Sequence, residues 1–268
     1  MRETFYPGVV SLALLSDLHA RPYENVIRSL QRHKPELIAI TGDIVYGSFP
    51  VDDKSPLVTQ TNVLPFLAAC TAIAPTYLSL GNHEQMLDEE DITDIRQTGV
   101  VVLDNEWKEL ILEGRKIVIG GLSSEYVTEY QEYRKGQHRA RYPRKESISC
   151  EERKPRTDWL SEYAAQPGYH ILLSHHPEYY DQIPQSVDLV LSGHAHGGQW
   201  NYYSFRQKRA CGIFAPGQGF FPKYTSGIYD RMIVSRGLSN TARIPRIFNP
   251  TEIVYIGKES VSAISLTS

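Results

Sequence analysis

Five short groups of polar residues in this chain have the side-chain types that bind divalent metal ions. They offer carboxylate, imidazole and amide donors but no thiolate, which favours a site for manganese, iron or zinc over a structural zinc site of the cysteine type. The groups are Asp17-Leu18-His19, Gly42-Asp43, Gly81-Asn82-His83-Glu84, Ser174-His175 and Gly193-His194-Ala195-His196. Because they span most of the chain, they can form one site only if the fold brings them together.

Each group follows an apolar segment that predicts a buried β-strand. The segments are rich in β-branched residues or leucine, and each ends at a small or polar residue. The predicted strands cover residues 9–15, 37–41, 76–80, 169–173 and 187–191. Since the carboxyl ends of parallel strands in an open α/β sheet converge on one crevice, we expect the five groups to meet there.

The segments between these strands predict the rest of the architecture. Helical spacing of apolar residues over 23–33 and 56–69 gives a strand–helix–strand–helix–strand start, which favours parallel strands with helices outside. A hairpin is expected from 110–112 and 116–120. Short strands are expected in the last third of the chain, at 228–235, 253–256 and 261–264. We therefore expect an α/β fold with antiparallel strands at the end of the sheet and two stacked sheets.

The spacing within the groups predicts which side chains point the same way. Asp17 and His19 are two residues apart, as are His194 and His196. Alternate residues of an extended loop point to the same side, so each pair is expected to face one ion. Three of the groups begin with a glycine, which allows a tight turn and a close backbone approach beside the ligand.

These five groups, in this order, resemble the motifs of the calcineurin-like metallophosphoesterase superfamily. The resemblance runs from Asp17 to His196, with each motif after a predicted strand. Residues 197–199, 216–224 and 234–238 further resemble the small bacterial, often membrane-associated phosphodiesterase branch. The superfamily resemblance implies a four-layer αββα sandwich of two mixed β-sheets flanked by helices.

The resemblance also implies two metal ions and a role for each ligand. One ion is held by Asp17, His19 and His196, the second by Asn82, His175 and His194, and Asp43 bridges them. Mn²⁺ is the expected metal, with Fe or Zn as alternatives. Two ions about 3.5–4 Å apart lower the pKa of a bridging water, so that hydroxide can attack phosphorus in line. His83 is not an expected ligand; it protonates the leaving oxygen as a general acid.

Two features depart from the commoner pattern of the superfamily. Ala195 stands where threonine is frequent, and His175 is followed by a second histidine, His176. We choose His175 as the ligand because it comes directly after the strand and Ser174, and His176 is left as a residue that lines the substrate cleft. Glu84 is interpreted as a carboxylate that orients an imidazole or begins a helix, not as a ligand.

The composition restricts the domain organisation, the partners and the location. With 268 residues, 41% of them hydrophobic, we predict one domain over 1–268 with a polar, basic insertion at about 125–156. A net charge of -3 argues against nucleic acid as a partner. Three cysteines without a C-x-x-C spacing fit a reducing compartment. The apolar run at 9–15 is too short to be a membrane anchor, so we expect a cytoplasmic protein, with peripheral membrane contact as an alternative.

The leading functional hypothesis is a phosphodiesterase or pyrophosphatase. Its substrate would be a phosphodiester, a nucleotide-linked small molecule or a lipid precursor of the UDP-diacylglucosamine type, and no obligate protein partner is indicated. A phosphomonoesterase, including a protein phosphatase, is an alternative. A nuclease is disfavoured by the mild acidity of the chain. A non-catalytic scaffold that keeps the fold is the alternative from another class, although every expected ligand position holds a competent donor.

Overall fold

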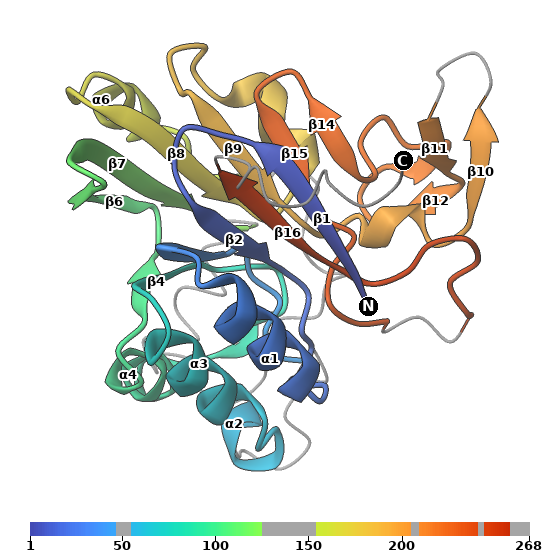
Figure 1. The fold of residues 1–268 in the computed structure, drawn as a ribbon, viewed down its shortest axis with the longest axis horizontal. Helices are drawn as coiled ribbons and strands as arrows, with labels where there is room; N and C mark the ends of the chain where they lie inside the picture. Colours follow the sequence, from blue (N-terminus) through green and yellow to red (C-terminus); the bar gives the residue numbers. More distant parts are fainter. Residues whose placement is uncertain (47–54, 125–153, 205–208, 241–243, 258–268) are drawn as a thin grey trace, which may run out of the picture.

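Two six-stranded β-sheets pack face to face, and helices cover their outer faces (Figure 1). The computed structural model describes residues 1–46, 55–124, 154–204, 209–240 and 244–257. The insertion predicted at 125–156 lies almost entirely outside the described residues, as does the strand predicted at 261–264.

The first sheet contains the three strands predicted before the N-terminal polar groups. Its strands, in spatial order, are β1 (Arg2–Pro7), β16 (Glu252–Gly257), β2 (Leu12–Leu15), β3 (Leu37–Ile40), β4 (Thr76–Ser79) and β5 (Val101–Leu103). Strands β2 to β5 run parallel, whereas β16 is antiparallel to β2 and parallel to β1. The sequence did not predict β1, because this edge strand carries Arg2 and Glu3 and has no continuous apolar run.

The second sheet contains the other two strands that precede polar groups. Its order is β14 (Gly227–Tyr229), β15 (Met232–Val234), β9 (Leu189–Ser192), β8 (Tyr169–Ser174), β7 (Arg115–Leu122) and β6 (Glu106–Leu112). The four central strands are parallel, and an antiparallel strand lies at each edge. The predicted hairpin is confirmed: β6 and β7 join at Glu113 and Gly114, both with positive φ.

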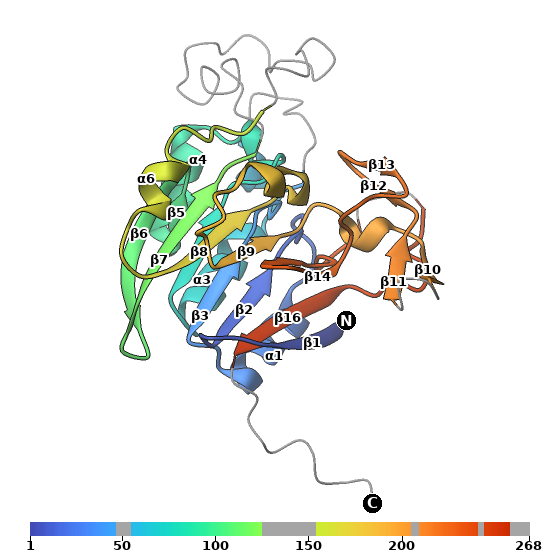
Figure 2. The ribbon, with the colours of Figure 1, turned by 90° about the horizontal axis from the view of Figure 1, so that it is seen from above.

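Helices lie on the outer face of each sheet (Figures 1 and 2). The first sheet is covered by α1 (Glu24–His33), α2 (Pro56–Thr59), α3 (Val63–Thr71) and α4 (Glu89–Gln97), and the second by α6 (Leu160–Ala164) and the 3₁₀ helix η3 (Pro177–Gln182). The prediction of one helix over 56–69 is wrong, because the helix is interrupted between the end of α2 and the start of α3. The amide of Gln60 accepts from the backbone N–H of Tyr46 at 2.6 Å and donates to its carbonyl at 2.8 Å, and this tertiary contact ends α2.

Three apolar cores separate the four layers. One packs between the first sheet and its helices and contains Leu15, Ile38 and Phe66. A second lies between the two sheets and contains Leu14 and Ile119. A third lies between the second sheet and its helices and includes Trp159, Tyr163 and Val190. This layering confirms the αββα fold class that the resemblance implied.

Two short hairpins lie at one end of the second sheet, after the 3₁₀ turn η4 (His196–Gly198) (Figures 1 and 2). They are β10 (Asn201–Ser204) with β11 (Arg209–Gly212), and β12 (Phe214–Ala215) with β13 (Gly219–Phe220). No helix in the described part of the chain is long and apolar enough to cross a membrane.

Candidate metal centre

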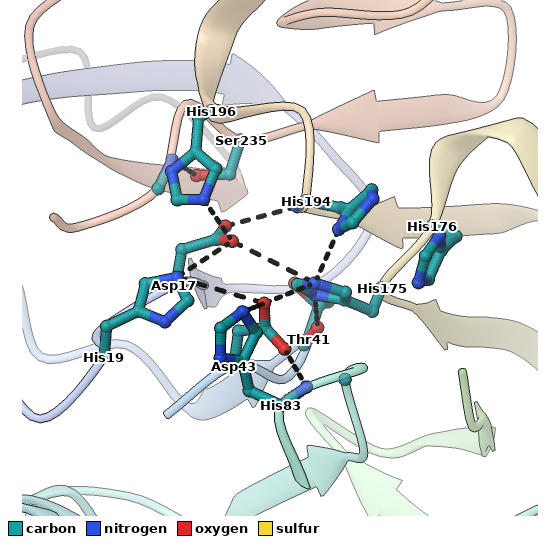
Figure 3. A network of polar contacts seen from close by, with 12 residues as sticks. Asp17, His19, Thr41, Asp43, His83, His175, His176, His194, His196 and Ser235 are labelled. Atoms are coloured by element: carbon teal, nitrogen blue, oxygen red, sulfur yellow. Dashed lines mark hydrogen bonds and ion pairs between the residues drawn. The ribbon is translucent and has the colours of Figure 1, made fainter. Parts of the chain in front are cut away.

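The loops at the carboxyl ends of strands from both sheets bring the aspartates and histidines of the predicted site into one cluster (Figure 3). The loop after β2 contributes Asp17 and His19, the loop after β3 contributes Asp43, the loop after β4 contributes Asn82 and His83, and those after β8 and β9 contribute His175, His194 and His196. The expected convergence of distant segments is therefore present in the structure.

One group of potential ligand atoms consists of Asp17, His19 and His196. Oδ1 of Asp17 is 3.8 Å from Nε2 of His19 and 3.5 Å from Nε2 of His196. The two imidazole rings stack with their centroids 5.3 Å apart. This is the set that the resemblance assigns to the first ion.

A second group consists of Asp43, His175 and His194. Nε2 of His175 is 3.0 Å from Oδ2 of Asp43 and 3.2 Å from Nδ1 of His194. The same Asp43 oxygen is 3.9 Å from Nε2 of His19, so this carboxylate lies between the two groups. That position suits the bridging role that the resemblance implies.

Asn82 and His83 come from the same short loop, but their polar atoms have different surroundings. Oδ1 of Asn82 is buried and has no hydrogen-bond partner. The backbone N–H of His83 donates to Oδ1 of Asp43 at 2.9 Å, and its Nε2 is 3.7 Å from Oδ2 of that carboxylate. His83 also forms a potential ligand group with His19 and Asp43, so the geometry permits a metal-binding role beside the predicted acid role.

The two neighbouring histidines after β8 have different surroundings. His175 faces Asp43, whereas Nδ1 of His176 lies 2.9 Å from Oε1 of Glu178. The His176 ring lies 3.9 Å from that of His194, measured between centroids. His176, Glu178 and His194 form a further potential ligand group, which the sequence interpretation did not include. The sequence signal that could have indicated this group was Glu178, two residues after His176.

Five of the seven proposed ligands adopt left-handed backbone conformations. The residues with positive φ include Asp17 (56°), His19 (49°), Asp43 (53°), His194 (61°) and His196 (47°). The expected extended loop geometry is therefore wrong, although the side chains still converge. Such conformations are uncommon for residues with a Cβ and require support from the surrounding chain. Part of this support is backbone packing: a Cβ on Gly42, which has φ 92°, would lie 2.4 Å from the backbone nitrogen of Gly81.

Glu84 holds two of the ligand loops together. Its carboxylate is buried and accepts from the backbone N–H groups of Asp43 (2.7 Å), Ile44 (2.8 Å), Val45 (3.2 Å) and Gly81 (2.7 Å). The sequence interpretation excluded it as a ligand, and the potential ligand groups do not contain it. Glu84 begins the 3₁₀ helix η1 (Glu84–Met86), which confirms one of the two interpretations from the sequence, and its carboxylate orients backbone rather than an imidazole.

The charges of the cluster depend strongly on one another. Burial disfavours a charged His175, but the nearby carboxylate of Asp43 outweighs this effect and raises the pKa of His175 to about 10. Burial alone would raise the pKa of Asp43, but the surrounding imidazoles, His175 foremost, lower it well below its usual value. Burial lowers the pKa of His196 to about 4. The proton on His175 thus compensates the buried carboxylate of Asp43, as a bound cation would.

The residues fit two divalent cations. Three predicted ligand atoms are buried without a hydrogen-bond partner, namely Oδ1 of Asp17, Nε2 of His19 and Oδ1 of Asn82. A buried polar atom without a partner is costly unless a ligand satisfies it. On the other side of the rings, Nδ1 of His19 and of His175 face backbone carbonyls at 3.2 and 2.6 Å, which leaves Nε2 toward the cluster.

Comparisons with known proteins match the part of the chain that carries these ligands. Residues 10–198, more than half of the chain, match the family model described as calcineurin-like phosphoesterase. A Caenorhabditis elegans protein named as a metallophosphoesterase is 26% identical over 271 residues, which cover 93% of this chain and 48% of that protein. An uncharacterised metallophosphoesterase of Aquifex aeolicus is 28% identical over 249 residues, which cover 90% of this chain and 82% of that protein. The chain thus spans about half the length of the first relative.

Similarity to solved structures is found at low sequence identity. A dimetal phosphatase from Danio rerio is 12% identical with a TM-score of 0.43, covering 85% of this chain and 88% of that chain. A 5'-nucleotidase precursor from Thermus thermophilus is 13% identical with a TM-score of 0.47, covering 76% of this chain and 45% of that chain.

Proposed function

This chain belongs to the calcineurin-like phosphoesterase family of metal-dependent phosphoric ester hydrolases, and we propose that it is a dinuclear phosphodiesterase or pyrophosphatase. The observation that carries the proposal is the pair of adjacent ligand groups with Asp43 between them. We assign Asp17, His19 and His196 to one ion, Asn82, His175 and His194 to the other, and Asp43 to both. Mn²⁺ is the metal we would load first, with Fe and Zn as alternatives.

Two bound divalent ions would supply Lewis acidity, an activated water as nucleophile and charge compensation at phosphorus. The residues of the chain supply the remaining parts of the reaction. Glu84 keeps the loops of Asp43 and His83 in register through its backbone contacts. His83, whose side chain is 24% exposed, lies beside Asp43 and donates the proton that the leaving oxygen needs. A nucleophilic serine or cysteine is not required, because phosphoryl transfer depends on positioning and electrostatics.

The surface beside the second ligand group supports a substrate with two organic arms on phosphorus. A Cβ on Gly217, in the turn between β12 and β13, would lie 3.4 Å from Nε2 of His194, so this hairpin packs against the centre. Phe220 and Phe221 at its end are 73% and 74% exposed. We propose that they contact the second arm of a phosphodiester, such as an acyl chain or a nucleobase. We further propose a cytoplasmic protein that would reach a lipid precursor at the membrane surface.

The test compares metal content and substrate preference of the purified protein. We expect two Mn²⁺ per chain after loading, and faster turnover of bis-p-nitrophenyl phosphate than of p-nitrophenyl phosphate. Asp43→Ala should lose both bound metal and turnover, because this carboxylate lies between the two groups. Unchanged turnover in that variant would refute the site assignment. A screen of nucleotides, cyclic nucleotides and UDP-linked lipid precursors then identifies the substrate class.

Two alternatives give different outcomes in the same experiment. Faster hydrolysis of the monoester indicates a phosphomonoesterase, including a protein phosphatase. A protein without bound metal and without esterase activity is the non-catalytic scaffold. Turnover of single- or double-stranded DNA at low salt would indicate a nuclease.

A further inference from the structure

Glu178, in the 3₁₀ helix η3, lies beside the proposed second metal site, and its carboxylate is held from two sides. Oε1 is 2.9 Å from Nδ1 of His176. A Cβ on Gly217, in the turn between β12 and β13, would overlap the same oxygen, so this turn packs on the carboxylate. The other oxygen, Oε2, is buried and has no hydrogen-bond partner. The carboxylate is therefore fixed in place and can still attract a further donor.

The ring of His194 presents its two nitrogens to different groups. Nδ1 faces the ligand cluster, 3.2 Å from Nε2 of His175 (Figure 3). Nε2 faces the other way and is 3.9 Å from Oε1 of Glu178. If the second ion binds at the cluster, it therefore meets Nδ1, whereas the carboxylate lies beside Nε2.

This arrangement suits the proton of a metal-binding imidazole. An imidazole that binds a cation is neutral and has one proton, so coordination through Nδ1 of His194 requires the proton on Nε2. The contact of 3.9 Å is longer than a hydrogen bond, and it acts through electrostatic attraction, which is stronger in a buried site than in water. A negative charge beside Nε2–H favours this tautomer and makes Nδ1 a better electron-pair donor.

A third cation held by His176, Glu178 and His194 is the competing interpretation of the same residues. The nitrogen of His194 near Glu178 is Nε2, and a neutral imidazole has only one nitrogen lone pair. Binding an ion through Nε2 would therefore exclude binding the second ion through Nδ1. The contact with Glu178 also occupies Nδ1 of His176. The geometry thus favours a carboxylate that supports the second site over a further ion.

We propose that Glu178 is a positioning residue of the second metal site. Its carboxylate keeps the ring proton of His194 on Nε2 and so directs the lone pair of Nδ1 to the ion. His176 has an indirect part, because its Nδ1 holds that carboxylate. The inference rests on the proposed function, because it presumes that His194 binds the second ion.

The experiment titrates Mn²⁺ into the full-length protein and into Glu178→Gln, which keeps the size of the side chain and removes its charge. Electron paramagnetic resonance follows binding. We expect the affinity of the second site to fall about 10-fold, the lower end of the usual effect of removing a partner of a ligand, because the contact is long. At intermediate Mn²⁺ the variant should show an isolated ion, as Asn82→Ala should, where the unchanged protein shows a spin-coupled pair. Glu178→Asp keeps the charge and should recover part of the affinity.

Asp188→Asn is the matched control. Oδ2 of Asp188 is 3.5 Å from Nδ1 of the buried His170, so this pair also places a carboxylate beside an imidazole of the second sheet. It lies where β8 and β9 begin, whereas the metal centre lies where they end. Because Asp188 also accepts from the backbone N–H of His170 at 2.7 Å, the control should lower the melting temperature in EDTA without changing the Mn²⁺ titration.

Two outcomes overturn the inference while the proposed function stands. One is a coupled pair with unchanged affinity in Glu178→Gln, whatever its melting temperature. The other is a third Mn²⁺ per chain that this variant loses, which would make Glu178 a ligand. Glu178→Asp serves for the titration if the glutamine variant does not fold, and full affinity of the second site there is expected to be lost in part. Absence of Mn²⁺ binding and esterase activity in the unchanged protein refutes the proposed function, and the inference with it.

Discussion

His83 differs from the other imidazoles of the centre in its access to solvent. Its side chain is 24% exposed, whereas the side chains of His19 and His175 are fully buried. Burial lowers the pKa of His83, and the carboxylate of Asp43 opposes this effect. A partly exposed imidazole beside the ligands can reach an oxygen of the substrate, and the buried rings cannot. Solvent exposure of the side chain therefore distinguishes His83, the proposed acid, from the buried ligands His19 and His175.

We expect His83→Ala to keep its bound metal and to lose turnover by about 10²–10⁴-fold, the usual cost of removing a general acid. Metal analysis and the kcat for bis-p-nitrophenyl phosphate measure the two effects separately. His33→Ala is a suitable control, since the His33 side chain is 27% exposed and pairs with Glu3 on the first sheet, away from the cluster. Loss of metal from the His83 variant would instead make His83 a ligand, together with His19 and Asp43.

At this scale the sequence predicted ligand types but not the residues that orient them. Asp17, Asp43 and the histidines could be recognised because short motifs after strands combine carboxylate and imidazole. The role of Glu84 in holding backbone could not, because it depends on tertiary contacts with the backbone N–H groups of Asp43 and Ile44. A residue that acts through backbone N–H groups leaves no periodic pattern in the sequence.

At the scale of elements, the buried central strands were predictable, whereas the edge strand β1 and the loops were not. Buried strands such as β3 and β9 form continuous apolar runs, which the sequence shows directly. The left-handed conformations of the ligand loops depend on contacts between different loops, so no local pattern predicts them. The break between α2 and α3 has the same origin, since Gln60 bonds to the backbone of Tyr46.

The prediction at the scale of elements concerns Glu84, because its carboxylate joins the loops after β3 and β4. Burial and the charge of Asp43 raise the pKa of Glu84 to about 7, so measurements at pH 8 examine the ionised form. In Glu84→Gln one side-chain oxygen becomes an NH₂ group that faces two backbone N–H donors. We expect this variant to lose about 3 kcal/mol in the free energy of unfolding, measured by urea denaturation.

Glu106→Gln provides the comparison for this loss. Its side chain is 43% exposed and pairs with Lys108, so its substitution should change the unfolding free energy by less than about 0.5 kcal/mol. Equal stability of the two variants would show that the four backbone contacts of Glu84 do not hold the loops. Loss of the second metal ion in Glu84→Gln, but not in Glu106→Gln, would connect this loop support to the centre.

For the whole molecule, the centre is the place where both sheets meet through polar side chains. Asp17, His19, Asp43 and Asn82 come from the first sheet, and His175, His194 and His196 come from the second. A bound pair of cations would therefore join the two halves of the sandwich. Ligands that bind only the folded state stabilise it by mass action. Metal should raise the melting temperature, and the size of this effect should depend on pH.

The sign of the pH dependence follows from the charges in the metal-free protein. The pKa of His175 is raised from 6.5 to about 10, so its stabilising contribution is complete below pH 6.5 and is lost as pH rises through about 10. The pKa of Asp43 is lowered, so its contribution is lost only as pH falls below 3.8. In EDTA we expect the melting temperature to fall between pH 7 and 10, whereas with Mn²⁺ it should stay nearly constant, because the ions replace the proton on His175. Differential scanning fluorimetry measures both curves; Asp43→Ala should give the same curve with and without Mn²⁺, and a flat curve in EDTA would contradict the argument.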